Sequence, residues 1–285
     1  MARFDYVLPE SLSEAVSFLK EYGDSAKVVA GGQSLMVMIR NRLLSPEYLV
    51  GLERIAGLNE IRLEGGRISI GAGTTYRSAY ETPEVRQRLG VLASAAEQAG
   101  PLPIRNMGTV IGSVCHNAPG ADVPPALLVL DARAHIVGPR GEREIALVDL
   151  FTDIFATTLQ LDEVVDKIII PEPPAGARGT YLKFSPRLID MSVVGVAVLI
   201  KLDSDGVCRE CRIAIGGVAD TPYRAHKMEE LLVGSRLEEG VLLEAGKAAA
   251  GERELLSDIH ASAEYRKKVM PVMIKRAVHK AIERG

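Results

Sequence analysis

The stretch Lys27-Val28-Val29-Ala30-Gly31-Gly32-Gln33-Ser34-Leu35 carries three structural signals in a short space. Residues 27–30 predict a short buried strand, and apolar residues from Leu35 to Leu43 recur at helical spacing. The glycines between them allow a tight turn whose main-chain N–H groups can approach an anion without interference from a Cβ atom. Ser34 either offers a hydroxyl to a phosphate or caps the helix. The unit is an anion-binding turn or an ordinary tight turn.

Regular elements are predicted on both sides of this unit. Ser11 and Glu14 have capping-box spacing, and Gly23 can end the helix that they begin. Apolar residues alternate on both sides of Gly65-Gly66, which predicts a β-hairpin over 61–70. Residues 83–100 are rich in alanine and predict one or two short helices.

The segment from Pro101 to Asp122 is rich in glycine, proline and asparagine, yet it leads into an apolar stretch, 123–130. We expect a long ordered loop here, because such loops carry function more often than they serve as simple connections. Small hydroxyl and amide groups beside a core suit a loop that wraps a polar ligand. An elaborate structural turn is the alternative.

A composition shift at Pro171–Gly176 predicts a linker. Before it lies an α/β region that ends at about residue 172, and after it a smaller α+β region. Met191–Lys201 and Val207–Gly216 predict strands joined by a hairpin turn at 203–206. Three helical stretches follow, and the last is predicted from Ala261 to Arg284.

The composition narrows the class of protein. The chain has 285 residues, 47% of them hydrophobic and 25% charged, which excludes a disordered chain. Its formal net charge is −3, which argues against nucleic-acid binding. The longest apolar run, Met191–Ile200, is about half of the roughly 20 residues that a membrane span needs. We expect a soluble cytoplasmic protein that binds neither nucleic acid nor membrane.

The three cysteines do not predict a metal site. A zinc or iron–sulfur site needs about four ligands, and Cys208-x-x-Cys211 has no second cysteine pair. Because three residues separate them along a predicted strand, these two side chains are expected on opposite faces. Cys115 and His116 lie in the polar segment.

Four motifs, in this order, carry a family resemblance. A-G-G-x-S-L occupies Ala30–Leu35, and R-N-x-G-T followed by P-x-A-D occupies Arg105–Asp122. Y-x-K-x-x-x-R-x-x-D occupies Tyr181–Asp190, and G-G-V-A-x-T-P-x-R-A occupies Gly216–Ala225. Across essentially its whole length the chain resembles the FAD-binding medium subunit of the molybdenum hydroxylase family, of the carbon monoxide dehydrogenase and xanthine dehydrogenase type.

The resemblance implies a fold of the α+β class in two domains. Residues 1–172 would form a two-lobed FAD-binding domain of the PCMH, vanillyl-alcohol-oxidase-like type, with lobes of about 1–57 and 58–172. Residues 177–285 would form a smaller C-terminal α+β domain of the carbon monoxide dehydrogenase flavoprotein type. A three-stranded sheet and helices are expected there.

The resemblance also implies a set of FAD-binding residues, and no catalytic residue. The implied cofactor-binding residues are Lys27, Val28, Val29, Ala30, Gly31, Gly32, Gln33, Ser34, Leu35, Thr109, Gly112, Ser113, His116, Asp122 and Lys183. Asp122 would accept hydrogen bonds from ribityl or ribose hydroxyls, and Lys183 would stabilise the reduced, anionic flavin. Without the resemblance, Lys183 and Arg187 could equally be solvated charges on a strand.

Two positions depart from the family pattern. Ile111 stands where the family has a glycine, and Ser113 where it has asparagine. Isoleucine disfavours positive φ, so we expect Ile111 to be extended or the cofactor to be met through its neighbours. Ser113 can replace one amide hydrogen bond.

By the resemblance, the function is electron transfer within an oxidoreductase complex. Non-covalent FAD in this chain would take electrons from [2Fe–2S] clusters of a small subunit and pass them to an acceptor such as NAD⁺. Molybdopterin would lie in a large subunit, and the complex would be a dimer of heterotrimers. Two alternatives stay open: a self-contained FAD oxidoreductase, or an assembly subunit that has lost FAD.

Overall fold

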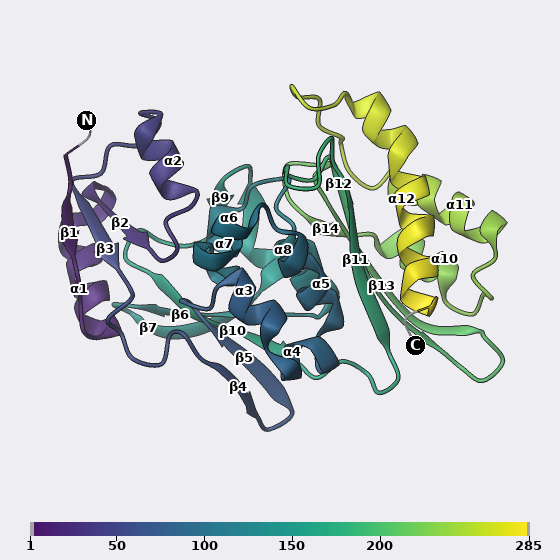
Figure 1. The fold of residues 1–285 in the computed structure, drawn as a ribbon, viewed down its shortest axis with the longest axis horizontal. Helices are drawn as coiled ribbons and strands as arrows, with labels where there is room; N and C mark the ends of the chain where they lie inside the picture. The colour runs from purple at the N-terminus through teal and green to yellow at the C-terminus, as the bar shows by residue number, and fades with distance from the viewer. Residues whose placement is uncertain (1–2, 284–285) are drawn as a thin grey trace.

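The structure, a computed structural model, describes residues 3–283. Three sheets of three or more strands follow one another along the molecule, with helices between the second and third and a further helical layer beyond the third (Figure 1). The predicted mixture of helices and sheets is confirmed. In the described residues no helix has the length and apolar character that crossing a membrane requires.

The N-terminal sheet is small and parallel. Its strands lie in the order β1 (Asp5–Val7), β3 (Tyr48–Gly51) and β2 (Ala26–Val29). Helix α1 (Leu12–Tyr22) begins and ends as predicted: Ser11 Oγ accepts from the Glu14 N–H at 3.2 Å, and Gly23 has φ 51°. Strand β2 leads through the glycine turn into helix α2 (Leu35–Arg40), which confirms the predicted unit.

The central sheet is antiparallel, with strand order β4-β5-β10-β6-β7. Its strands are β4 (Ile61–Glu64), β5 (Arg67–Gly71), β6 (Arg133–Gly138), β7 (Gly141–Ala146) and β10 (Val164–Pro171). The predicted hairpin is β4–β5, and Gly65 and Gly66 have φ 57° and 73° at its turn, values that side chains rarely tolerate. Helix α9 (Leu147–Leu150) and the short pair β8 (Phe151–Asp153) and β9 (Ala156–Thr157) link β7 to β10.

Short helices fill the space between the central sheet and the third sheet (Figure 1). They are α3 (Tyr76–Glu81), α4 (Pro83–Arg88), α5 (Gly90–Gln98), α6 (Leu102–Met107), α7 (Val110–His116) and α8 (Val123–Val129). The two short helices predicted in 83–100 are α4 and α5.

The predicted long loop over 101–122 is wrong, because this segment contains α6 and α7. Thr109 caps α7 by accepting the Gly112 N–H at 3.0 Å, and Val110, Ile111 and Val114 bury one face of the helix. The glycine and asparagine content suggested a loop. Gly112 instead lies inside the helix, and Asn117 ends it.

The third sheet contains β11 (Arg178–Phe184), β12 (Val194–Leu202), β13 (Cys208–Gly216) and β14 (Tyr223–Arg224), in that order. The three long strands match the predicted three-stranded sheet, and the two-residue β14 extends it. In β12, Val196 and Val198 face outward, whereas Ala197 and Leu199 pack with the central helices. Burial of both faces explains the continuous apolar run of β12.

Three helices cover the outer face of this sheet (Figure 1). They are α10 (His226–Leu232), α11 (Glu239–Ala249) and α12 (Ala263–Glu283). They correspond to the three predicted helical stretches. The predicted end of the last one, Arg284, lies outside the described residues.

The expectation that Cys208 and Cys211 point to opposite faces is wrong. Both side chains are buried in the same outer core, and a register shift in the β12–β13 pairing explains it. Leu202 pairs with Cys208 and Lys201 with Glu210, so one extra residue is accommodated between them. That bulge reverses the alternation of faces, and both cysteines are free thiols.

Candidate functional site

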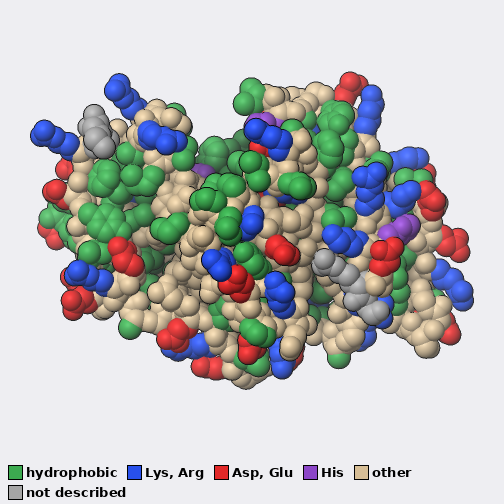
Figure 2. All heavy atoms as spheres, viewed as in Figure 1, with side chains coloured by type: hydrophobic (Ala, Val, Ile, Leu, Met, Phe, Trp, Pro, Cys, Tyr) green, Lys and Arg blue, Asp and Glu red, His purple; other side chains and the backbone are tan. Residues whose placement is uncertain are grey.

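A cavity of about 450 Å³ brings together two segments that are far apart in sequence, the β2–α2 connection and α7. Figure 2 shows the surface hollowed at its upper edge, where Figure 1 places α2 opposite α6 and α7. Of the predicted cofactor-binding residues, Lys27–Leu35, Thr109, Gly112, Ser113 and His116 line this cavity. Asp122 and Lys183 are not among its lining residues and lie together beside α5 and α8.

Gly31 is where the two segments touch. A Cβ atom on Gly31 would overlap the carbonyl oxygen of Met107, and Gly32 has φ 68°, so both positions favour glycine. The Ser34 side chain makes no capping hydrogen bond, although it immediately precedes α2. This turn therefore exposes main chain and a hydroxyl to the cavity. These groups fit the phosphate groups of a dinucleotide cofactor.

Helix α7 forms the facing wall. Ile111 is helical rather than extended, and its side chain is 3% exposed, so the expectation of an extended residue is wrong. Ile111 both packs in the core and lines the cavity. Isoleucine in place of the family's glycine is therefore compatible with the helix that forms this wall. Ser113 lies on the same helix and hydrogen-bonds the hydroxyl of Tyr76, a residue that sequence reasoning missed.

Three titratable side chains of the cavity have pKa values shifted by burial. Burial raises the pKa of the Cys115 thiol to about 12 and that of the Tyr76 hydroxyl to about 12, so both are protonated. Burial lowers the pKa of His116, which keeps the imidazole neutral. Of these three groups, only the neutral imidazole of His116 can accept a proton at neutral pH.

The buried ion-pair network consists of Asp122, Tyr181 and Lys183. Tyr181 Oη donates to Asp122 Oδ1 at 2.8 Å, and Lys183 Nζ lies 3.1 Å from Asp122 Oδ2. Lys183 also donates to the carbonyls of Gln98 and Asp190, each at 2.8 Å. The side chains of Lys183 and Asp122 are only 2% and 6% exposed. Lys183 is thus not a solvated charge.

Burial dominates the electrostatics of this network. It raises the pKa of Asp122 to about 6, against the opposing effects of Lys183 and of the Tyr181 hydrogen bond. Arg187, from the same sequence motif, differs completely: its side chain is 75% exposed and it pairs only with Asp190.

The other lining residues were not among the predicted cofactor-binding residues, although Gly108 belongs to the R-N-x-G-T motif. They are Met38, Leu44, Leu52, Ala72, Tyr76, Gly108, Ile111, Cys115, Phe155, Leu159, Glu163, Val164 and Val165. Most are apolar residues of α2, its neighbours or the β8–β10 region. Tyr76 ends the segment G-A-G-T-T-Y, an incomplete glycine fingerprint, which is the one local signal that pointed toward it.

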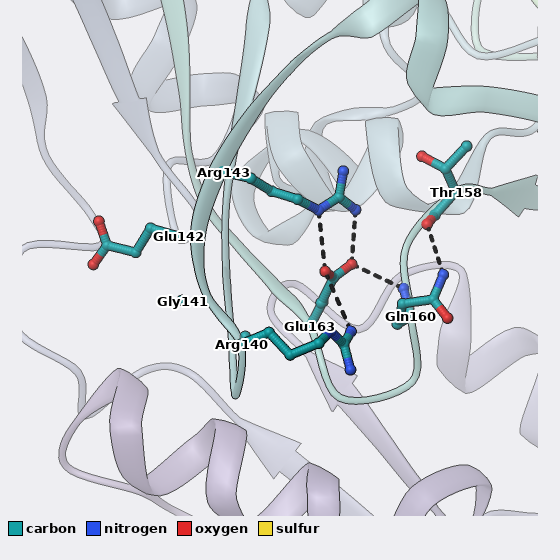
Figure 3. A pocket seen from close by; sticks show the side chains of 8 residues that line it. Arg140, Gly141, Glu142, Arg143, Thr158, Gln160 and Glu163 are labelled. Carbon is teal, nitrogen blue, oxygen red and sulfur yellow. Dashed lines mark hydrogen bonds and ion pairs between the residues drawn. The ribbon is translucent and has the colours of Figure 1, made fainter.

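A second pocket, of about 540 Å³, is larger, and charged side chains that pair with one another line it (Figure 3). Arg143 makes two hydrogen bonds to Glu163, at 3.1 and 2.8 Å, and Arg140 lies 3.8 Å from the same carboxylate. The hydrogen bonds from Arg143 hold the pKa of Glu163 below its usual value. Because Glu163 also lines the first cavity, the cluster fixes the start of β10.

The fold and the glycine-turn cavity define a dinucleotide-binding flavoprotein. Residues 2–173 match the family described as FAD binding domain in molybdopterin dehydrogenase, and residues 180–281 match the CO dehydrogenase flavoprotein C-terminal domain. The chain belongs to this family of FAD-binding subunits of the molybdenum hydroxylases.

Individual relatives are similar over their whole lengths. The 6-hydroxypseudooxynicotine dehydrogenase complex subunit alpha of Paenarthrobacter nicotinovorans is 34% identical, over 99% of this chain and 95% of the relative. The carbon monoxide dehydrogenase medium chain of Afipia carboxidovorans is also 34% identical, over 99% and 98%. A chain of the reconstituted CO dehydrogenase from Oligotropha carboxidovorans superposes with a TM-score of 0.96 at 33% identity, covering 99% and 98%. Like these dehydrogenase subunits, the chain is an oxidoreductase component that binds FAD.

Proposed function

We propose that this chain holds FAD without a covalent bond and conducts electrons between a partner subunit and an external acceptor. The observation that carries the proposal is the cavity, which joins the glycine turn to α7. Bound FAD would supply the ability to accept electrons singly and to release two as a hydride.

Each predicted residue group has a distinct task in this proposal. The turn at Gly31–Ser34 and the wall at Thr109–Ser113 hold the pyrophosphate and the sugars. Lys183 from β11 of the third sheet and Asp122 from the start of α8 approach the ribityl chain and the isoalloxazine, with a fixed cation and a carboxylate in a dry environment. Neither oxygen of Asp122 is free, so binding a ribityl hydroxyl would require sharing it with Tyr181 or Lys183.

The names of the relatives support the partner subunits in this proposal. Two of them are named medium chains of carbon monoxide dehydrogenases, a name that implies larger and smaller companions. We infer that this chain stands between a small subunit with [2Fe–2S] clusters and an acceptor such as NAD⁺. A large subunit with molybdopterin would perform the substrate chemistry, in a dimer of heterotrimers.

The two alternatives are weaker. A self-contained oxidoreductase needs an acid or base at the flavin. Cys115 and Tyr76 stay protonated, which leaves the neutral imidazole of His116 as the one candidate base among these three groups. Loss of FAD was suggested only by Ile111, and its helical, buried placement removes that reason.

The test begins with an absorption spectrum of the purified chain, then acid precipitation and chromatography of what is released. Free FAD in the supernatant is expected, whereas colour in the pellet would mean covalent attachment. Anaerobic mixing then follows. The flavin should be reduced by the complex's substrate only when the partner subunits are present. Reduction of the isolated chain by that substrate would favour the self-contained enzyme.

A further inference from the structure

Arg266, in the helix α12 that covers the outer face of the third sheet, is a cation buried away from the cofactor cavity (Figure 1). It is 1% exposed. Its guanidinium donates to the carbonyls of Val193 and Leu256, at 2.6 and 3.1 Å, and to the carbonyl of Gly217. Nη2 also donates to Asp258 Oδ1 at 2.6 Å. These bonds fix both the place and the orientation of the guanidinium plane.

Packing alone does not require a cation at this position. Taking a charge out of water is unfavourable unless hydrogen bonds replace its hydration, and an apolar side chain fills similar space without that cost. The same helix uses Met270, Met273 and Ile274 in this way in the outer core. Arginine instead supplies several donors at fixed angles. What Arg266 adds is therefore control over the position of the groups that it binds.

Two of these groups lie at the same end of the third sheet. Val193 immediately precedes β12, and Gly217 immediately follows β13, its neighbour in the sheet. The two ends are closely packed, because a Cβ atom on Gly217 would lie 2.6 Å from the carbonyl oxygen of Ser192. One nitrogen of Arg266, Nη1, donates to both Val193 and Gly217. It thereby bridges the two strand ends.

The bridged strand ends hold the segment that leads to Asp122. The Gly217 N–H donates to the carbonyl of Pro119 at 2.6 Å. The N–H and the Oγ of Ser192 both donate to the carbonyl of Gly120, each at 3.1 Å. Asp122 follows shortly afterwards, at the start of α8. The position of its carboxylate therefore depends on where the ends of β12 and β13 lie.

Lys183 is attached to the same strand ends. The Val193 N–H donates at 2.9 Å to the carbonyl of Phe184, the residue after Lys183. Lys183 Nζ donates at 2.8 Å to the carbonyl of Asp190, in the connection that leads to Val193. Both partners of the buried ion pair are thus held by segments that the arginine fixes.

Resting on the FAD role proposed above, we propose that Arg266 is a positioning residue that sets where the Asp122–Lys183 pair stands relative to the flavin. A cation near the flavin stabilises its reduced, anionic form, and this Coulomb energy changes with distance. The helix on the outer face of the third sheet thereby influences how readily the flavin is reduced. Arg266 acts through the strand ends, since its own hydrogen bonds go to them and to the segment 256–258.

The experiment measures the reduction potential of FAD bound to the intact chain, by titration against a reference dye. Arg266→Lys is the main variant, because lysine keeps the charge but lacks the planar fork of donors. Relative to oxidised FAD, reduced FAD is expected to bind about three-fold more weakly in this variant than in the wild type. An unchanged potential in Arg266→Lys would overturn the proposal. So would a lowered potential in Arg266→Met alone, because the charge would then act directly and not through position.

Met273→Ala is the matched control. It removes a side chain of the same helix that is 5% exposed, so it loosens the outer core but leaves the arginine in place. Its potential should equal that of the wild type, and a shift as large as that of Arg266→Lys would overturn the proposal. If Arg266→Lys fails to fold, Ser192→Ala tests the next link by removing one donor to Gly120. A wild-type potential in Ser192→Ala would then overturn it.

Amide hydrogen exchange of the FAD-free chain gives a second measurement. Arg266→Lys and Met273→Ala are compared at denaturant concentrations that give them the same global free energy of unfolding. The N–H groups of Ser192 and Gly217 should exchange about ten-fold faster in Arg266→Lys. Equal exchange rates in the two variants would mean that the arginine does not hold the strand ends, and would overturn the proposal.

Lys183→Met separates this inference from the proposed function. Relative to oxidised FAD, it should weaken the binding of reduced FAD about ten-fold, which for a two-electron couple is about 30 mV. A wild-type potential in Lys183→Met, or a wild-type chain that takes up no FAD, would refute the proposed function itself. In the Lys183→Met background, Arg266→Lys should cause no further shift. An additive shift would show that Arg266 acts independently of the pair and would overturn only the positioning role.

Discussion

The glycine turn at Gly31 and the buried ion-pair network at Asp122, to which the proposed function gives the same cofactor, are built in opposite ways. Because Gly31 has no side chain, its main chain can contact the main chain of Met107 and Gly108. At Asp122 it buries charged side chains almost completely and satisfies them with each other and with carbonyls. The first region depends on shape, and the second on electrostatics.

This difference predicts which kind of substitution destabilises each region. A close main-chain contact is destabilised when a Cβ atom is added to it. A buried ion pair is destabilised when one partner is removed, because the other charge is then left buried and unpaired. Helix α7 belongs to the first region and α8 to the second. Asp122 precedes α8, and at the other end of that helix Arg212 and Arg224 bind Asp131, at 2.6 and 2.9 Å. The third sheet thus holds α8 at both ends.

Ile111→Gly is expected to give the largest effect, because it puts the family's glycine into a wall that here relies on core packing. Loss of a side chain that is 3% exposed, together with a glycine inside α7, should lower the free energy of unfolding by about 4 kcal/mol. Urea unfolding of the FAD-free chain measures it. Leu188→Gly, at an 87% exposed position, is the control and should change the free energy by under about 1 kcal/mol. An equal loss in both variants would contradict the view that α7 is a packed wall.

Lys183→Met should come next, since it leaves Asp122 buried without its cation. We expect a loss of about 3 kcal/mol in the free energy of unfolding at pH 7, measured by urea unfolding. Arg187→Met, in the same motif but 75% exposed, should cost no more than about 0.5 kcal/mol. Similar losses in the two variants would mean that burial does not increase the contribution of Lys183 to the free energy of unfolding.

The sequence predicted the parts of the molecule whose signals are local. Ser11, Glu14 and Gly23 delimit α1, and Gly65-Gly66 requires the hairpin, because capping bonds and positive φ act within a few residues. The residues of the glycine turn were found for the same reason. Much of the rest of the chain needs tertiary information.

Particular residues show why the rest was missed. Gly112 suggested a loop, but the burial of Val110 and Val114 against distant elements stabilises a helix there. The bulge near Cys208 depends on the pairing with β12, which no spacing rule reveals. Phe155 enters the cavity only because Asn117, far from it in sequence, fixes its turn.

Gly31→Ala tests the shape-dependent region directly. The new Cβ atom meets the carbonyl of Met107 and the Cα of Gly108, both main chain, so the two segments must separate. We expect about 2 kcal/mol of destabilisation and weaker FAD binding, measured by thermal unfolding and fluorescence titration. Gly240→Ala, where nothing lies within 4 Å of the new atom, should leave both quantities unchanged or slightly raise stability. Wild-type FAD affinity in Gly31→Ala would show that the cofactor does not need this close approach.

The pH dependence of stability should give the smallest effect, and it tests the electrostatic region without a deletion. Burial raises the folded pKa of Asp122 to about 6, above the usual value of 3.8, so between these values the folded state binds more protons than the unfolded state. Stability from this group is therefore present at low pH and is lost as pH rises through about 6. Between pH 5 and 7 the loss should be about 1 kcal/mol.

Asp122→Asn removes the titrating group. We therefore expect the free energy of unfolding to fall more steeply with pH in the wild type than in the variant. Urea unfolding at pH 5, 6 and 7 should show the wild type losing about 1 kcal/mol more than the variant over this range. Parallel pH profiles would mean that Lys183 and Tyr181 hold Asp122 ionised in spite of its burial. In that case the network would present a permanent carboxylate to the cofactor, and its electrostatic preparation would come from the ion pair and not from desolvation.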